Sequence, residues 1–226
     1  MKVAIFGAHG RVGKLIVQKI RQSYADKITP LAILRSEEQK EEPLYNGLNT
    51  SITSLTEGVG KLTEILKGQD AVIFSAGAGG KGLDKTFAVD LDGAVKVMEA
   101  SKNAGVERFI MVSAIAAEER DFWYDRIPAL RSYYIAKKYA DRELRSTDLN
   151  YTILQPGNLA DDGETGKLAY NFTGSELSRL EFPVMKIFRA DVAQFAIDIL
   201  QDPRSYRQTL TLLNGHRSFD EYLSDI

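Results

Sequence analysis

Tyr133 and Lys137 stand four residues apart in the segment YYIAKK, and together they could move a proton. The apolar spacing of residues 129–146 predicts a helix, on which both side chains share one face, one turn apart. An ammonium group beside a phenol favours the phenolate and should lower the pKa of Tyr133 from its usual value of about 10. Such a tyrosine can act as a general acid or base toward a carbonyl or hydroxyl group near neutral pH.

The same segment contains a second pair with this spacing, Tyr134 and Lys138. A tyrosine and a lysine four residues apart are also common by chance. In that case the tyrosine is a half-buried helix residue and the lysine belongs to a solvated face. The sequence leaves both the register and this simpler interpretation open.

Ser113 provides a second group for the same chemistry. It ends the apolar run 108–113, which reads as a strand. Active sites of open α/β sheets gather at the carboxyl ends of strands. We therefore expect the Ser113 hydroxyl to hydrogen-bond the substrate oxygen that Tyr133 serves.

The first twenty residues read as a strand, a glycine-rich turn and a helix. Residues 3–6 are apolar, and the turn GAHGRVG follows, with helical spacing over 15–20. Gly7 lets the strand turn sharply, Gly10 lets a pyrophosphate approach the backbone, and Gly13 lets the helix pack on the strand. The helix N-terminus then offers free N–H groups to phosphates. The alternative is an ordinary turn that happens to be rich in glycine.

The run 28–34 predicts a second strand, and it ends at Arg35 and Ser36. In a dinucleotide-binding fold this strand end meets the adenosine ribose, where an arginine suits the 2′-phosphate of NADP. Arg11 in the glycine turn could reach the same phosphate, and two guanidinium groups with a hydroxyl favour NADP(H).

An acid at this position would instead bind the 2′-hydroxyl of NAD. Glu37 and Glu38 are close enough in sequence to do so, and Arg35 could simply be a solvated strand end. NAD(H) is therefore the less favoured cofactor.

The strand predicted over 69–75 leads into small residues. Ser75, Ala76 and Gly77 would leave room for a ribose or nicotinamide against the backbone. A flexible loop is the alternative.

Alternating strands and helices predict an α/β fold of the Rossmann type, a doubly wound parallel sheet with helices on both faces. We expect one domain over 1–226, with about 156–226 forming a small lobe on the substrate side. Further strands are expected at 48–52, 150–154, 167–171 and 208–213, and helices at 55–66, 83–104 and 189–200, the last strongly amphipathic. Ser218 could cap a short final helix.

Two stretches are predicted to be loops. Residues 36–47 are polar, and residues 116–128 combine many charges with Phe122, Trp123 and Tyr124. The aromatic loop could lie over the site and shape a substrate pocket, or it could only pack on the surface.

The composition excludes several classes of function. The formal net charge is −2, without runs of Lys or Arg, so neither nucleic acid nor a membrane surface is an expected partner. The chain has no cysteine and two histidines, which excludes disulfides and makes a metal site improbable. It shows no signal peptide or membrane-spanning run, and the lack of cysteine fits the cytoplasm.

Five segments together resemble the short-chain dehydrogenase/reductase superfamily: GAHGRVG, SAGAG, FIMVSA, YYIAKK and YTILQPGNL. They are most similar to its atypical branch of small NAD(P)-binding proteins, kin to NmrA-type redox sensors and flavin/biliverdin reductases. The likeness runs from Met1 to about Leu213. Two positions depart from the pattern: Ser51 stands where an Asp is frequent, and Gln155 stands where an Arg is usual.

The resemblance implies a Rossmann fold with a catalytic set. Tyr133 matches the tyrosine, Lys137 the lysine and Ser113 the serine, and Asp90 falls where classical members have an Asn. Lys137 would also hold the cofactor ribose. The residues implied to bind the cofactor are Gly7, His9, Gly10, Arg11, Val12, Gly13, Arg35, Ser36, Ser75, Ala76, Gly77, Lys137 and Pro156.

The resulting hypothesis is an NADP(H)-dependent oxidoreductase that acts on a small carbonyl-type substrate. A dinucleotide-binding sensor that regulates a protein partner is the main alternative, and a homodimer is conceivable. Sugar-nucleotide epimerisation uses the same groups, but it normally needs a larger lobe than the roughly 70 residues after the sixth strand. An interaction module with a vestigial nucleotide site is a third alternative.

Overall fold

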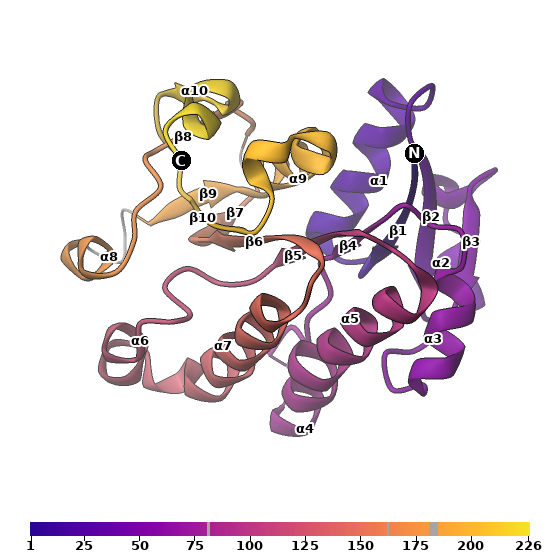
Figure 1. The fold of residues 1–226 in the computed structure, drawn as a ribbon, viewed down its shortest axis with the longest axis horizontal. Helices are drawn as coiled ribbons and strands as arrows, with labels where there is room; N and C mark the ends of the chain where they lie inside the picture. The colour runs from indigo at the N-terminus through magenta and orange to yellow at the C-terminus, as the bar shows by residue number, and fades with distance from the viewer. Residues whose placement is uncertain (81, 162, 181–184) are drawn as a thin grey trace.

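The computed structural model describes residues 1–80, 82–161, 163–180 and 185–226. Its centre is a seven-stranded sheet in the order β10-β6-β5-β4-β1-β2-β3 (Figure 1). The strands are β1 (Lys2–Phe6), β2 (Thr29–Leu34), β3 (Asn49–Ile52), β4 (Ala71–Phe74), β5 (Arg108–Val112), β6 (Asn150–Pro156) and β10 (Gln208–Leu212). Every pair in the sheet is parallel, which confirms the predicted doubly wound fold.

The strand order reverses between β1 and β4, since the chain builds outward from β1 to β3 and then returns to β4. At such a reversal the loops leave the sheet in opposite directions and open a crevice at the carboxyl ends of the strands. The glycine turn follows β1 there, and the small residues follow β4.

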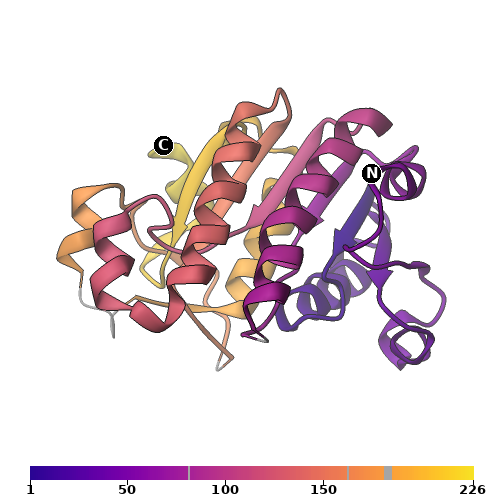
Figure 2. The same ribbon diagram turned by 90° about the horizontal axis from the view of Figure 1, so that it is seen from below.

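Helices cover both faces of the sheet (Figures 1 and 2). One layer contains α1 (Arg11–Ser23) and α9 (Arg189–Asp198), which pack on each other. The other contains α3 (Val59–Leu66), α5 (Asp92–Ala104) and α7 (Arg131–Ser146). Because both faces are covered, β4 and β5 are buried along their whole length.

The segment 83–104 does not form one uniform α-helix. It begins with α4 (Leu83–Lys85), continues as a π-helical turn (Thr86–Leu91) and becomes α5 only at Asp92. π-Turns inside helices often mark functional sites. Here the turn carries the buried Asp90.

Two segments predicted as loops contain helices. Residues 36–47 include α2 (Glu37–Lys40) and a 3-10 turn (Pro43–Tyr45). Residues 116–128 include α6 (Arg120–Arg126), in which Phe122 and Trp123 are buried. The aromatic side chains stabilise this helix by packing, although its charged residues have no clear helical period.

The C-terminal third contains small strands, of which the sequence predicted only the one that begins at Lys167. The short strand β7 (Asn158–Ala160) pairs with β9 (Lys186–Phe188), and β8 (Lys167–Leu168) pairs with β11 (Arg217–Ser218). The strand predicted over 167–171 therefore ends at Leu168. The helix α8 (Ser175–Arg179) lies between β8 and β9 in the chain.

Two predictions about the last helices have different outcomes. Ser218 caps α10 (Phe219–Ser224) in a capping box with Glu221, as expected. The prediction that α9 is strongly amphipathic was wrong, because α9 packs against α1 on one side and Phe219 and Tyr222 on another. Most of its residues are therefore buried.

Within the described residues, no helix is long and apolar enough to span a membrane.

Candidate active site

The glycine turn after β1 leaves space only for backbone. Gly7 has a positive φ of 79°, and the Gly10 N–H donates to the Gly7 carbonyl oxygen at 2.8 Å. A Cβ added to Gly13 would lie 2.1 Å from that same oxygen. Only glycine fits at these two positions, because one needs the left-handed region and the other touches backbone.

The first turn of α1 is open to an anion. Gly10 is the N-cap residue and supplies no side-chain cap, and the first turn holds no acidic residue. The N–H groups of this turn and the positive end of the helix dipole are therefore available to a pyrophosphate. Val12, expected near the cofactor, turns its side chain into the core.

The loop after β4 lies beside the same turn. The Ser75 hydroxyl donates to the Phe6 carbonyl oxygen at 3.1 Å, and a Cβ on Gly7 would touch Ala76 backbone at 2.6 Å. A Cβ on Gly77 would lie 3.0 Å from Asp90 Oδ1. The glycine turn and the loop after β4 thus lie against each other and form one cradle.

Asp90 and Lys137 form a buried ion pair at this cradle. Lys137 Nζ lies 3.1 Å from Asp90 Oδ1, and the two side chains are 4% and 1% exposed. Asp90 Oδ2 also accepts a hydrogen bond from the Ala78 N–H at 2.9 Å. Burial alone would lower the pKa of Lys137, but Tyr133 and Asp90 raise it by more, so the ammonium group is retained.

Tyr133 lies beside this ammonium group, with Lys137 Nζ 5.6 Å from the ring centroid. The expectation of a lowered tyrosine pKa is wrong for the ligand-free protein. Burial raises the pKa of Tyr133 by more than Lys137 lowers it, and Asp90 and Asp141 add to the rise. Part of the residue remains accessible at the surface, yet its surroundings are dense enough for burial to dominate.

The alternative pair, Tyr134 and Lys138, contacts α6 and the segment before it and does not join Asp90. Tyr134 stacks on Trp123 of α6, with ring centroids 5.6 Å apart and planes at 12°, and it is 4% exposed. Lys138 Nζ donates to the Glu118 carbonyl oxygen at 2.9 Å. Tyr134 also meets Tyr133 edge to face, so α6 supports the side of α7 that carries Tyr133.

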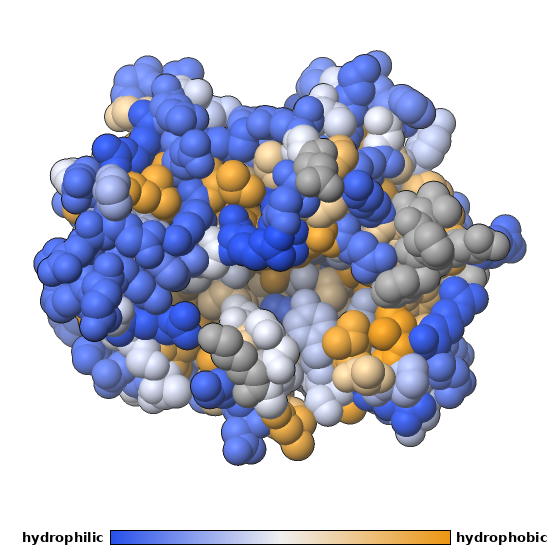
Figure 3. Space-filling view, turned by 180° about the vertical axis from the view of Figure 1, so that it is seen from behind, coloured by the Kyte–Doolittle hydropathy of each residue, from blue (hydrophilic) through white to orange (hydrophobic). Residues whose placement is uncertain are grey.

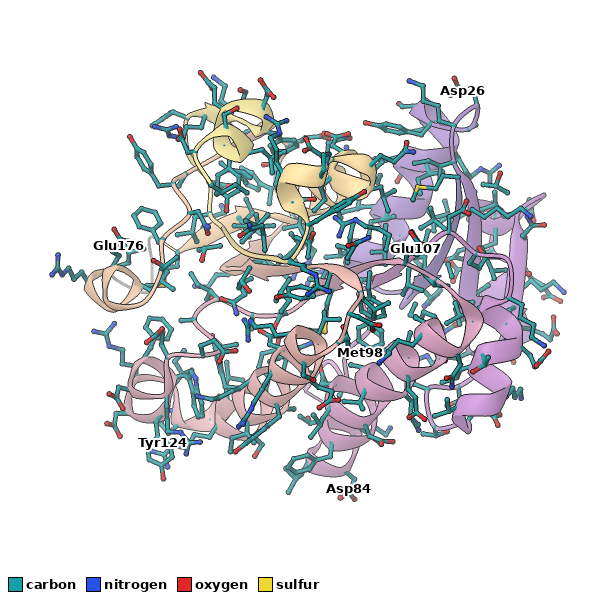
Figure 4. All side chains as sticks on the ribbon, viewed as in Figure 1. Asp26, Asp84, Met98, Glu107, Tyr124 and Glu176 are labelled. Atoms are coloured by element: carbon teal, nitrogen blue, oxygen red, sulfur yellow. The ribbon has the colours of Figure 1, made fainter. Side chains whose placement is uncertain are left out.

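Of the three adjacent aromatic residues, only Tyr124 is largely exposed, at 43%. Figure 4 shows it on the outer side of α6. Phe122 and Trp123, which were expected to shape a substrate pocket, are therefore packed inside the protein beside α7. The Trp123 indole N–H donates to the Ala117 carbonyl oxygen at 3.1 Å.

Ser113 faces a buried carboxylate that sequence reasoning missed. Asp141 Oδ2 accepts a hydrogen bond from the Gln155 amide at 2.9 Å, and this amide and the Ser113 hydroxyl both act to lower the pKa of Asp141. Within the part of the chain that the structure describes, Ser113 Oγ and Asp141 Oδ1 have no hydrogen-bond partner. Burial raises the pKa of Asp141 to about 6. Its spacing could have revealed it, since Tyr133, Lys137 and Asp141 recur every four residues on one helix face.

The charged residues around the glycine turn divide into two groups. Arg11 pairs with Asp161, which also binds Arg189 at 2.8 Å. His9 Nε2 and Lys14 Nζ lie 2.5 and 2.8 Å from the two carboxylate oxygens of Glu42. Of these residues, the sequence predicted only His9 and Arg11 near the cofactor. Their partners, Glu42 and Asp161, were missed because they come from distant segments of the chain.

The remaining expected cofactor residues lie at strand ends. Arg35 is exposed just beyond β2, and Ser36 is the N-cap residue of α2 without a side-chain cap. Pro156 ends β6, and its carbonyl oxygen accepts a hydrogen bond from Ile115 at 3.0 Å. The face opposite to that of Figure 1 is hollowed near its centre, with strongly hydrophilic side chains beside the hollow (Figure 3).

Comparison with known proteins places this cradle in context. A family described as NAD(P)H-binding matches residues 7–203. A yeast protein named UPF0659 protein YMR090W (Saccharomyces cerevisiae) is 43% identical over 100% of this chain and 99% of its own length. The "uncharacterized sugar epimerase YhfK" of Bacillus subtilis is 37% identical over the whole of both chains. The solved structure of the oxidoreductase ylbE from Lactococcus lactis has a TM-score of 0.83 and 31% identity, covering 100% of this chain and 96% of that one.

Proposed function

The chain belongs to the NAD(P)H-binding family, and on that premise we propose that it is an oxidoreductase that transfers hydride between NADP(H) and a small carbonyl-type substrate. The observation that carries the proposal is the group formed by Tyr133, Lys137 and Asp90, buried beside the glycine cradle. Such a group supplies the proton donor that reduction of a carbonyl needs.

The uncapped first turn of α1 would hold the pyrophosphate, and the small residues after β4 would admit the nicotinamide ribose. When bound, the cofactor supplies the hydride chemistry. Asp90 fixes Lys137, and Lys137 lies against Tyr133. The raised pKa keeps the Tyr133 phenol protonated at neutral pH, so it is set up to donate a proton to a substrate oxygen. Ser113 would orient that oxygen.

Reduction of a carbonyl therefore suits the site better than oxidation of an alcohol, because reduction needs the acid form of Tyr133. Arg35 favours a cofactor with a 2′-phosphate, since it is exposed at the end of β2. Arg11 contributes less to this preference, because Asp161 already engages it.

The test is NADPH oxidation by the purified protein with a panel of small carbonyl compounds and quinones. Tyr133→Phe should abolish turnover and leave NADPH binding, measured by calorimetry, within about twofold. Tyr139→Phe is the matched control, because Tyr139 lies on the same helix and is 43% exposed. Equal turnover by wild type and Tyr133→Phe would refute the role of Tyr133.

Two other functions remain to be separated. The Bacillus subtilis relative is named a sugar epimerase, which supports epimerisation as a second candidate function. An epimerase would isomerise a sugar nucleotide without net consumption of cofactor. A sensor of NADP(H) that binds a regulatory partner predicts no turnover, and Tyr133→Phe would leave its ligand-dependent partner binding intact.

A further inference from the structure

Glu42 holds together the two basic groups next to the glycine turn. Its carboxylate oxygens lie 2.5 Å from His9 Nε2 and 2.8 Å from Lys14 Nζ. His9 belongs to the turn itself, and Lys14 lies in the first part of α1. The hydrogen bonds from Lys14 and His9 hold the pKa of Glu42 below its usual range, so the carboxylate is ionised at neutral pH.

The backbone around Glu42 is fixed against the glycine turn. Tyr45, which is 2% exposed, donates its hydroxyl to the Ala8 carbonyl oxygen at 3.0 Å. Arg21 of α1 donates to the carbonyl oxygens of Pro43 and Leu44. The segment that carries Glu42 is therefore held against the glycine turn and α1.

This carboxylate lies in the region where the sheet would receive an adenosine ribose. β1 and β2 are parallel neighbours, with Phe6 opposite Ile33, so the glycine turn and Arg35 leave the sheet at the same edge. The segment from Arg35 to Glu42 contains only α2 and its flanking residues. His9 and Lys14 thus contact Glu42 beside the glycine turn, and Arg35 follows the neighbouring strand β2 at the same edge.

A 2′-phosphate and a 2′-hydroxyl meet this arrangement differently. A phosphate must compete with the carboxylate for His9 and Lys14 and is repelled by it, since both are anions. A hydroxyl can donate a hydrogen bond to a carboxylate. Arg35 and Glu42 therefore act in opposite directions on the choice of cofactor.

We propose that Glu42 is the specificity residue that weakens binding of a 2′-phosphate, so that Glu42 and Arg35 together set the preference between NADP(H) and NAD(H). The inference rests on the proposed dinucleotide function. It assigns the role of a ribose-facing acid to a residue in the turn after α2, and not to Glu37, which pairs with Lys40 within α2.

The test is calorimetric binding of NADPH and NADH to wild type, Glu42→Gln and Glu41→Gln. Glu41 is exposed and adjacent in the chain, so its substitution removes the same charge without touching His9 or Lys14. Glu42→Gln should raise the ratio of the NADPH to the NADH association constant about tenfold, because it removes a unit charge beside the phosphate. Glu41→Gln should leave the ratio within about twofold.

A second pair of probes isolates the adenosine end. Adenosine 2′,5′-bisphosphate should gain affinity for Glu42→Gln, while adenosine 5′-monophosphate should not. An unchanged ratio, or an equal gain for both nucleotides, would overturn the assignment of Glu42 and leave the proposed function standing. If neither protein bound any dinucleotide, the proposed function itself would fail, and the inference with it.

Discussion

The Asp141 carboxylate accepts a hydrogen bond from the Gln155 amide at 2.9 Å, and the two side chains are 0% and 3% exposed. A neutral amide cannot offset the burial of a carboxylate as a guanidinium group does. Asp141 therefore has a pKa raised to about 6, although Arg145 and Lys137 lower it from farther away.

This raised pKa predicts an unusual dependence of stability on pH. Between about pH 4 and pH 6 the folded protein binds a proton that the unfolded chain has already lost, so the free energy of unfolding falls as pH rises. Above pH 6 this contribution no longer changes with pH. Burial of the ionised Asp141 carboxylate then lowers the free energy of unfolding by about 3 kcal/mol. Asp141→Asn should remove the fall, as measured by urea unfolding between pH 4 and pH 8. Asp26→Asn, at an exposed turn (Figure 4), should keep the wild-type curve; a fall that persisted in Asp141→Asn would contradict the assignment.

The ion pair between Asp90 and Lys137 predicts strong coupling. Asp90→Ala leaves a buried ammonium group without its carboxylate and should cost about 3–5 kcal/mol of unfolding free energy. Adding Lys137→Met to Asp90→Ala should recover part of that loss. Wild type, Asp90→Ala, Lys137→Met and the double variant form a double-mutant cycle, and urea unfolding measures the stability of each protein. Strict additivity would show that the two groups do not interact in solution.

Gly13→Ala tests the cradle. The added Cβ would lie 2.1 Å from the Gly7 carbonyl oxygen, so the turn must shift, and dinucleotide affinity should fall at least tenfold. Gly60→Ala in α3 is the matched substitution, since no atom lies within 4 Å of its Cβ. It should stabilise the protein by up to about 1 kcal/mol and leave binding unchanged. Thermal unfolding and calorimetry measure the two effects.

Arg108 predicts a large structural cost far from the glycine cradle. Its buried guanidinium group donates to the carbonyl oxygens of Asn150, Ile199 and Leu200 and to the hydroxyls of Thr152 and Ser205. Arg108→Met removes all of these buried hydrogen bonds and should cost about 3 kcal/mol or more. Arg204→Met, which breaks only solvent-exposed pairs with Asp202 and Asp220, should cost far less than Arg108→Met. Similar losses in chemical unfolding would refute the distinction.

The sheet was predictable because most of its strands, such as β1, β4 and β5, are short apolar runs that alternate with periodic helices. The helix α6 was not predictable, since its two buried residues, Phe122 and Trp123, are adjacent and show no helical period. Trp123 stacks on Tyr134, which lies on α7. The three-residue strands β7 and β9 show no period of their own. They form because each supplies the other's hydrogen bonds.

The candidate site was predictable where chemistry is local. Tyr133 and Lys137 lie one turn apart on one helix, and three glycines lie within one turn. Glu42 and Asp141 were missed because their partners come from other segments: Glu42 meets His9, 33 residues away, and Asp141 meets Gln155 on β6. The direction of the Tyr133 pKa shift depended on burial, which spacing does not reveal.

The packing of α1 against α9 joins the beginning of the chain to its end. The Tyr24 hydroxyl donates to Asp198, 174 residues later, at 2.6 Å. During synthesis the glycine turn is therefore complete long before the helix that supports it is made. A nascent chain exposes the apolar side of α1, where chaperones bind, until α9 emerges. The apolar side of α1 is thus buried only once two segments far apart in the sequence have both been made.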